Sequence, residues 1–256
     1  MGLLEGKKAL IFGVANEKSI AWAIAEAFKK EGAEVALAYA NEAIAKRVIP
    51  LAESIGATIT LPCDVRSDDD IKAVFAEIGK KWGGLDILVH SVAFANKDEL
   101  KGSFLSTTRE GFTMAMDISA YSLIALAKEA MPLLTASNGN VLALTYYGAQ
   151  KVFPNYNVMG VAKAALEASV RYLAEAVGQD GVRVNAISAG PLRTLAAAGV
   201  GGFNQIAGHV SAKAPLRRNI TQEDVAGAAV YLSSELAKAV TGEIHFVDSG
   251  YNIIGL

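Results

Sequence analysis

The chain has 256 residues, of which 52% are hydrophobic, with a net charge of −2 and a mean hydropathy of +0.30. This length suits one α/β domain, and no apolar run reaches the roughly 18 residues that span a bilayer. The balanced charge gives no case for nucleic acid, and the single cysteine, Cys63, excludes an intrachain disulfide and a cysteine metal cluster. The first residues lack the basic-then-apolar layout of a signal peptide, so we expect a cytoplasmic protein with no membrane partner.

Short β-rich apolar runs alternate with longer stretches of helical periodicity. In chain order, strands are predicted at 8–13, 33–39, 57–63, 85–91, 140–146, 182–188 and 242–248. Helices are predicted at 19–32, 67–83, 111–134 and 156–178. The strands carry few polar positions, which is typical of a parallel sheet covered on both faces. We predict a single α/β domain over 1–256, a Rossmann-like doubly wound parallel sheet of about seven strands flanked by helices.

The loop after the first strand is a candidate phosphate-binding turn. Gly13 allows a tight exit from the strand, and Ser19 and Ile20 open the next helix, whose free N–H groups suit a pyrophosphate. The spacing departs from the G-x-G-x-x-G fingerprint of dinucleotide-binding turns. An ordinary βα loop therefore remains an equal alternative for this stretch alone.

The ends of the second and third predicted strands indicate how a nucleotide could be bound. Asp64 follows the third strand, where a carboxylate can accept a hydrogen bond from an adenine amino group, although a helix or turn cap is an equal alternative. The second strand ends in "AYANE", with no acid for a ribose 2′-hydroxyl and no cation for a 2′-phosphate. Lys46 and Arg47 come later, on the expected next helix. The pattern favours NADH over NADPH.

Tyr156 and Lys163 stand seven residues apart in a helical stretch. Seven steps of about 100° return to within about 20° of the starting direction, roughly 10 Å further along the axis, so both side chains share one face. Asn155 is expected to cap this helix and to place Tyr156 in its first turn, near the positive end of the helix dipole. A reaction centre and a core tyrosine beside a surface lysine are the two alternatives for the pair.

Other candidates have simpler explanations. His90, His209 and His245 lack metal-ligand spacing, so we expect them to be structural or surface residues and predict no metal site. The acidic run "SDDD" at 67–70 is explained by a cap with carboxylates at a helix N-terminus. Cys63 is expected to be buried filler rather than a nucleophile.

Several stretches together resemble one enzyme family. "YNVMGVAK" and "VRVNAISAGPLRT", with the strand ends, resemble the short-chain dehydrogenase/reductase superfamily, in most of whose members the catalytic tyrosine stands four residues before the lysine. Here that position is Met159, which cannot donate a proton. A tyrosine seven before the lysine resembles the bacterial NADH-dependent enoyl-acyl-carrier-protein reductases. "KSIAWAIAEAF", "LVHSVAFA" and "TREGFTMAMDISAYS" extend the likeness over nearly the whole chain.

The resemblance implies roles for particular residues. It makes Tyr156 the catalytic tyrosine and Lys163 the ribose-binding lysine, with Tyr146 a second tyrosine of the acyl site and Ala95 facing the substrate. The residues that it places at NADH are Gly13, Ser19, Ile20, Asp64, Val65, Val92, Lys163, Leu192, Arg193, Thr194, Leu195 and Ala196. It also implies a substrate-binding loop and helix at about 191–212.

The activity implied by the resemblance is reduction of the carbon–carbon double bond of trans-2-enoyl thioesters on an acyl carrier protein, by a homotetramer, as the last reductive step of bacterial fatty-acid elongation. Ala40 departs from the polar residue of many relatives, and Ala93 replaces the glycine of several, narrowing the pocket by about a methyl. A carbonyl or alcohol dehydrogenase of the same superfamily is a rival that Met159 disfavours. A nucleotide-sensing or scaffold protein on this fold is a second rival, disfavoured by the joint presence of Tyr146, Tyr156 and Lys163.

Overall fold

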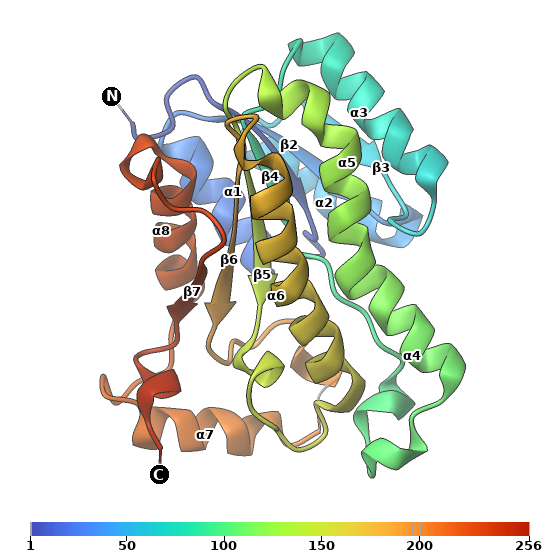
Figure 1. Cartoon of the computed structure of the whole chain (residues 1–256), viewed down its shortest axis with the longest axis vertical. Helices are drawn as coiled ribbons and strands as arrows, with labels where there is room; N and C mark the ends of the chain where they lie inside the picture. The colour runs from blue at the N-terminus through green and yellow to red at the C-terminus, as the bar shows by residue number, and fades with distance from the viewer. Residues whose placement is uncertain (1, 196, 200, 256) are drawn as a thin grey trace.

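The structure, a computed structural model, describes residues 2–195, 197–199 and 201–255. Within these residues, seven strands form one parallel sheet in the order β3-β2-β1-β4-β5-β6-β7 (Figure 1). Their bounds are β1 Lys8–Phe12, β2 Glu34–Tyr39, β3 Ile59–Pro62, β4 Ile87–His90, β5 Asn140–Thr145, β6 Arg183–Ala189 and β7 Ile244–Val247. Each strand lies within two residues of its predicted ends, and the predicted Rossmann-like doubly wound sheet is confirmed.

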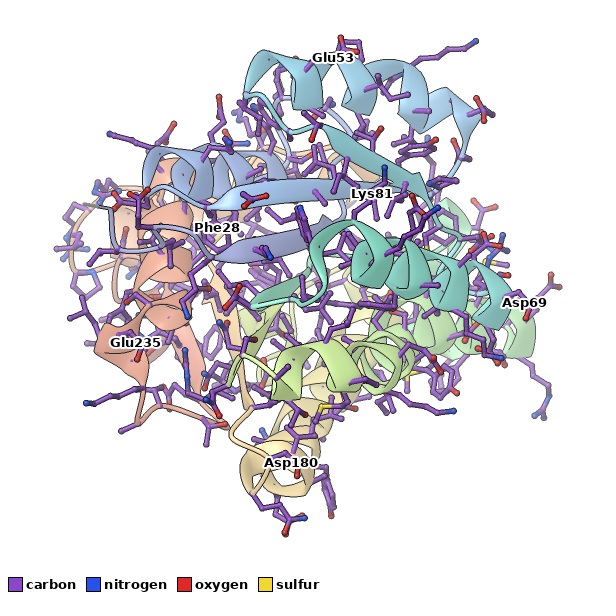
Figure 2. All side chains as sticks on the ribbon, turned by 90° about the horizontal axis from the view of Figure 1, so that it is seen from above. Phe28, Glu53, Asp69, Lys81, Asp180 and Glu235 are labelled. Atoms are coloured by element: carbon purple, nitrogen blue, oxygen red, sulfur yellow. The ribbon has the colours of Figure 1, made fainter. Side chains whose placement is uncertain are left out.

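Helices cover both faces of the sheet. One face carries α1 (Ile20–Lys30), α2 (Glu42–Ser54) and α8 (Gln222–Ser233), and the other carries α3 (Asp68–Trp82), α5 (Ser122–Thr135) and α6 (Asn157–Gly178). Phe28 of α1 is fully buried in the first core, whereas Asp69 and Asp180 are exposed at the periphery (Figure 2).

Alternation along the strands divides the apolar side chains between two cores. In β1, Ala9 and Ile11 join the core under α1 and α8, while Leu10 and Phe12 join the core under α3, α5 and α6. Successive side chains of a strand point to opposite faces, so a strand with no polar position needs a helical layer on each side. The high content of hydrophobic residues therefore fills two cores, one on each face of the sheet.

The predicted helix 111–134 contains a π-helical turn. The structure divides this stretch into α4 (Arg109–Met116), a π-helical segment Asp117–Tyr121 and α5. The Ser119 hydroxyl accepts from the Phe94 N–H at 3.0 Å and lies 3.2 Å from the Phe94 carbonyl oxygen, to which it donates. The predicted helix is confirmed, with one wider turn that carries Ser119 to the backbone beyond β4.

Three helices, α2, α7 (Phe203–Lys213) and α8, lie outside the four stretches in which periodicity predicted a helix, although a helix was expected to carry Lys46 and Arg47. Helix α8 is a short, alanine-rich helix that packs on α1, and its start is marked by a capping box between Thr221 and Asp224. That box is a readable sequence signal. Helix α7 follows a 3₁₀ turn at Ala197–Gly199. In the segment 191–212, where a loop and a helix were expected, the helix therefore occupies the second half.

The strands point toward α7, which lies across their carboxyl ends, while α4 continues α5 to one side of them (Figure 1). The strand order reverses between β1 and β4, and the crevice beyond such a reversal is where doubly wound sheets hold their ligands. Of the described helices, none combines the length and the hydropathy of a membrane span.

Candidate active site

Tyr156 lies at the point where a loop enters α6. It occupies the N-cap position, with helical backbone angles, and its N–H donates to the Phe153 carbonyl at 3.1 Å. Asn155 was expected to cap the helix, and that expectation is wrong. Its backbone is left-handed, with φ of 64°, and its side-chain amide donates to the Gly201 carbonyl at 3.2 Å. Asn155 therefore joins the entry to α6 to the segment that precedes α7.

The two predicted site tyrosines are in contact. Tyr146 follows β5, and its ring centroid lies 5.0 Å from that of Tyr156 at an interplanar angle of 75°, an edge-on arrangement that aromatic pairs favour. Gly148 makes this contact possible, because a Cβ there would lie 2.5 Å from the Tyr156 ring. The structure thus brings together a phenol from the end of a strand and a phenol from the start of a helix.

Both phenols are held in their protonated form. Burial raises the pKa of each, an effect to which the negative charge of Glu167 adds at Tyr156. A phenol that keeps its proton at neutral pH can donate a hydrogen bond to an oxygen on which negative charge develops. The pair therefore offers hydrogen-bond donors in apolar surroundings.

Lys163 is buried on the same helix. Its side chain is 6% exposed, and its ammonium donates to the Leu144 carbonyl of β5 at 2.7 Å. Burial, opposed by the charge of Glu167, lowers the pKa of Lys163 to about 8. An ammonium has three donors, so the bond to Leu144 leaves others for a ligand. The alternative of a surface lysine is wrong.

A small cluster of apolar residues packs beside Tyr156. Ala95 and Tyr156 pack against a buried cluster made by Leu100, Ala115, Val158 and Met159. Met159, at the position where most of the superfamily has its tyrosine, is 5% exposed. Its sulfur lies 3.8 Å from the Ser119 hydroxyl oxygen. Ala95 and Tyr156 therefore pack on the same apolar cluster.

The turn after β1 has the features of a phosphate site. Gly13 has φ of 104°, and a Cβ there would collide with the Ser91 carbonyl after β4. The buried Ser19 hydroxyl accepts from the N–H groups of Ala15 and Asn16 at 3.0 and 3.1 Å. Helix α1 consequently begins at Ile20 without a side-chain cap, which leaves its first N–H groups for an anion. Val92 lies half-buried across the same crevice.

Asp64 lies beyond β3 and caps a turn, since its carboxylate accepts from the Arg66 N–H at 3.0 Å, but it is not the cap of α3. That cap is Ser67, whose hydroxyl accepts from the Asp70 N–H, as the run "SDDD" predicted. The Arg66 side chain binds the Asp64 carboxylate at 2.5 Å and lowers its pKa. Val65 is half-buried beside it. The carboxylate is thus ionised and fixed, with part of its surface open to a hydrogen-bond donor.

The segment after β6 borders a cavity of about 490 Å³. Leu192 and Arg193 line it together with residues of α7 and the start of α8. Thr194 accepts from the Ala197 N–H at 3.1 Å, and Leu195 is exposed. Neither tyrosine nor Lys163 lines this cavity, so it adjoins the candidate site rather than forming it. Ala196 lies outside the described residues.

His90 and Cys63 are structural. The His90 ring is fully buried with Nε2 2.8 Å from the Ser122 hydroxyl, and burial lowers its pKa to about 3. Burial raises the pKa of the Cys63 thiol to about 12, which makes it a poor nucleophile. Across the described residues, no group of three or more His, Cys, Asp or Glu side chains is arranged to hold a metal ion.

Sequence reasoning missed Glu167. This buried residue follows Lys163 by one helical turn and accepts hydrogen bonds from Thr145 and Gln150. Its signal was present, since it is the acidic residue on the otherwise apolar face of α6 that also carries Lys163.

A doubly wound sheet in which the helix after β5 carries a lysine preceded by a tyrosine is the arrangement of a short-chain dehydrogenase/reductase, here with the tyrosine two turns rather than one turn before the lysine. A family model described as enoyl-(acyl carrier protein) reductase matches residues 13–252. The chain is 56% identical, over 99% of its length and 97% of the relative's, to an enoyl-acyl-carrier-protein reductase (NADH) of Rickettsia prowazekii. The chain belongs to the enoyl-acyl-carrier-protein reductase family, which confirms the predicted resemblance.

Two similar solved structures carry nucleotides. The reductase of Anaplasma phagocytophilum in complex with NAD is 52% identical, with a TM-score of 0.95, over 100% of this chain and 97% of the other. The reductase of Bacillus cereus with NADP⁺ and indole naphthyridinone is 52% identical, with a TM-score of 0.97, over 100% of both chains.

Proposed function

We propose that this chain reduces the carbon–carbon double bond of trans-2-enoyl thioesters on an acyl carrier protein with NADH, completing each cycle of fatty-acid elongation. The observation that supports this is the contact of Tyr146 with Tyr156 on the helix that carries the buried Lys163. Such a reduction requires a hydrogen-bond donor for the thioester oxygen and a group that binds the cofactor, and these residues can supply both. When bound, NADH supplies the hydride for the β-carbon of the substrate.

Tyr156 is the donor to the thioester oxygen, where negative charge develops as the double bond is reduced. Its place at the N-cap of α6 puts that oxygen near the positive end of the helix dipole. Tyr146 and Ala95 line the acyl side of the site. Lys163 binds the nicotinamide ribose with the donors that Leu144 leaves free and adds positive potential.

The remaining cofactor contacts follow the crevice between β1 and β4. Gly13, Ser19 and Ile20 would hold the pyrophosphate at the start of α1, Asp64 and Val65 would hold the adenine, and Val92 would also contact NADH. Leu192 to Ala196 cover the nicotinamide and pyrophosphate, and the loop and helix at 191–212 bind the acyl chain. These assignments are supported by the uncapped start of α1 and by the left-handed Gly13.

The assay that tests the function is NADH oxidation with a 2-enoyl thioester, on the carrier protein or on a small thiol, against a ketone of similar size. We expect turnover of both thioesters and none of the ketone, because Met159 stands where carbonyl reductases have their tyrosine. Turnover of the ketone alone would favour the carbonyl dehydrogenase, and turnover of neither would favour a nucleotide-sensing protein.

We expect NADH to be preferred over NADPH by at least about tenfold in kcat/KM, the effect of one charge-assisted hydrogen bond. Beyond β2, the chain offers Ala40, then Asn41 as the cap of α2, then Glu42, whose negative charge disfavours a 2′-phosphate. An Ala40→Arg variant should raise kcat/KM for NADPH. The Bacillus cereus relative was solved with NADP⁺, so a preference for NADPH is the outcome to check for. If this chain prefers NADPH, Lys46 or Arg47 must reach the 2′-phosphate.

NADH affinity should depend on pH through Lys163. Its pKa of about 8 means that the ammonium form prevails at neutral pH and is lost as the pH rises through that value. The dissociation constant for NADH should therefore be constant near pH 7 and weaken about tenfold by about pH 9. Calorimetric titrations across this range measure it, with Lys163→Met as a variant whose profile should be flat. Constant affinity in the parent chain would contradict the role of Lys163.

We also propose that the chain works in the cytoplasm as a homotetramer. Exposed apolar side chains on α4 to α6 support an assembly, among them Phe112, Tyr121, Ile124 and Val161. The single, buried Cys63 suits a reducing compartment.

A further inference from the structure

Glu167 is a buried carboxylate in α6 that makes two long-range contacts. It is 4% exposed, and its two oxygens accept from the Thr145 hydroxyl at 3.0 Å and from the Gln150 side-chain amide at 3.2 Å. Thr145 is the last residue of β5, and Gln150 ends the 3₁₀ turn Tyr147–Ala149. The carboxylate therefore holds both ends of the short segment 145–150.

The segment 145–150 carries Tyr146, and the helix that holds it carries Tyr156 and Lys163. The 5.0 Å contact between the tyrosine rings thus depends on how this segment packs against α6. A carboxylate with two charge-assisted hydrogen bonds is a strong fixed point for such packing.

Glu167 also faces the charge of Lys163. Two titratable groups interact electrostatically with the Lys163 ammonium, His90 on β4 and Glu167 on α6, and the phenols of Tyr146 and Tyr156 belong to the same candidate site. His90 is neutral at physiological pH, and both phenols keep their protons. Among the described residues that act on Lys163, Glu167 accordingly provides the negative charge that favours the ammonium over the free amine.

We propose that Glu167 is a positioning residue of the reductase, which holds the Tyr146 segment against α6 and keeps Lys163 charged under working conditions. It acts through Tyr146 and Lys163 and does not itself touch the substrate. This inference rests on the proposed function. It states that one buried anion, Glu167, maintains the arrangement of the groups that carry out the reaction.

The first test is Glu167→Gln, which keeps the size of the side chain and removes its charge. The new amide can hydrogen-bond to Thr145 and Gln150 once the Gln150 amide turns over, so the network is retained. NADH affinity is measured by calorimetry from about pH 6 to about pH 9. We expect the pH at which affinity falls to move downward, so that at about pH 8 NADH binds the variant roughly tenfold more weakly than the parent.

Glu175→Gln is the matched control, because Glu175 is an exposed glutamate on the same helix. It should reproduce the parent's pH profile. A Glu167→Gln profile that coincides with the parent's would overturn the electrostatic part of the proposal, since a merely structural role would lower affinity equally at every pH.

The second test separates position from charge. Thr145→Val removes one hydrogen bond and keeps the charge of Glu167, so kcat for the enoyl thioester should fall about tenfold while the pH profile of NADH binding stays in place. Thr145→Ser restores the hydroxyl and should restore kcat. Parental kcat in Thr145→Val would overturn the positioning part, and this variant decides the matter if Glu167→Gln fails to fold.

The failures of the two proposals are distinguishable. A parent chain that binds NADH but does not reduce the enoyl thioester contradicts the proposed function. A parent chain that reduces it, with Glu167→Gln and Thr145→Val both behaving as the parent, contradicts only the role of Glu167.

Discussion

A Tyr156→Phe variant is expected to lose about a hundredfold in kcat with an enoyl thioester, the lower end of the range for loss of one oxyanion donor. The substitution keeps the ring and its edge contact with Tyr146 and removes the phenol proton. The loss stays at the lower end because the α6 dipole and Lys163 still act on the developing charge. Steady-state NADH oxidation at saturating substrate measures it, with the NADH dissociation constant determined in parallel.

Tyr172→Phe provides the control for this variant, since Tyr172 is an exposed tyrosine of the same helix and is 80% accessible. It should leave kcat unchanged. If Tyr156→Phe turns over as fast as the parent, Tyr156 is not the donor. If it loses NADH affinity to the same extent as kcat, the phenol serves the cofactor instead.

A Lys163→Met variant is expected to weaken NADH binding by roughly 1.5–3 kcal/mol, which is about a tenfold to 150-fold rise in the dissociation constant. The physical reason is the loss of a charged donor to the ribose hydroxyls. Because the Leu144 carbonyl also loses its partner, the thermal midpoint should fall as well, and circular dichroism is needed to show that the variant is folded at the titration temperature.

Lys151→Met removes an exposed lysine from the neighbouring loop and should bind NADH as the parent does. Equal effects of the two substitutions would indicate general electrostatic attraction of the cofactor. Unchanged affinity in a folded Lys163→Met variant would refute the assignment of the ribose to this side chain.

Most of the sheet could be predicted from the sequence, because strands such as β1 and β5 are short, apolar on both faces and bounded by polar loops. The π-helical turn between α4 and α5 could not, since it depends on the bond between Ser119 and the distant Phe94 backbone. Helix α8 escaped notice because its buried surface is broad and its periodicity weak, although its capping box was readable.

The spacing of Tyr156 and Lys163 predicted a shared helical face, and both belong to one site. The cap at Asn155 was mispredicted because asparagine favours two conformations, the extended one of a helix cap and the left-handed one adopted here. Glu167 was missed because its meaning depends on Thr145 and Gln150, which lie far from it in sequence and reach it only when β5 packs against α6.

The strand order reverses between β1 and β4, and the two halves of the chain contribute different parts of the proposed site. The groups proposed for the adenosine half of the cofactor come from β1 to β4, whereas Tyr146, Tyr156, Lys163 and Glu167 all belong to the unit from β5 to the end of α6. Sites that share no side-chain partner contribute nearly additive free energies. Nucleotide preference and bond-reducing chemistry can therefore change independently in this scaffold, each by substitutions on its own side of the crevice.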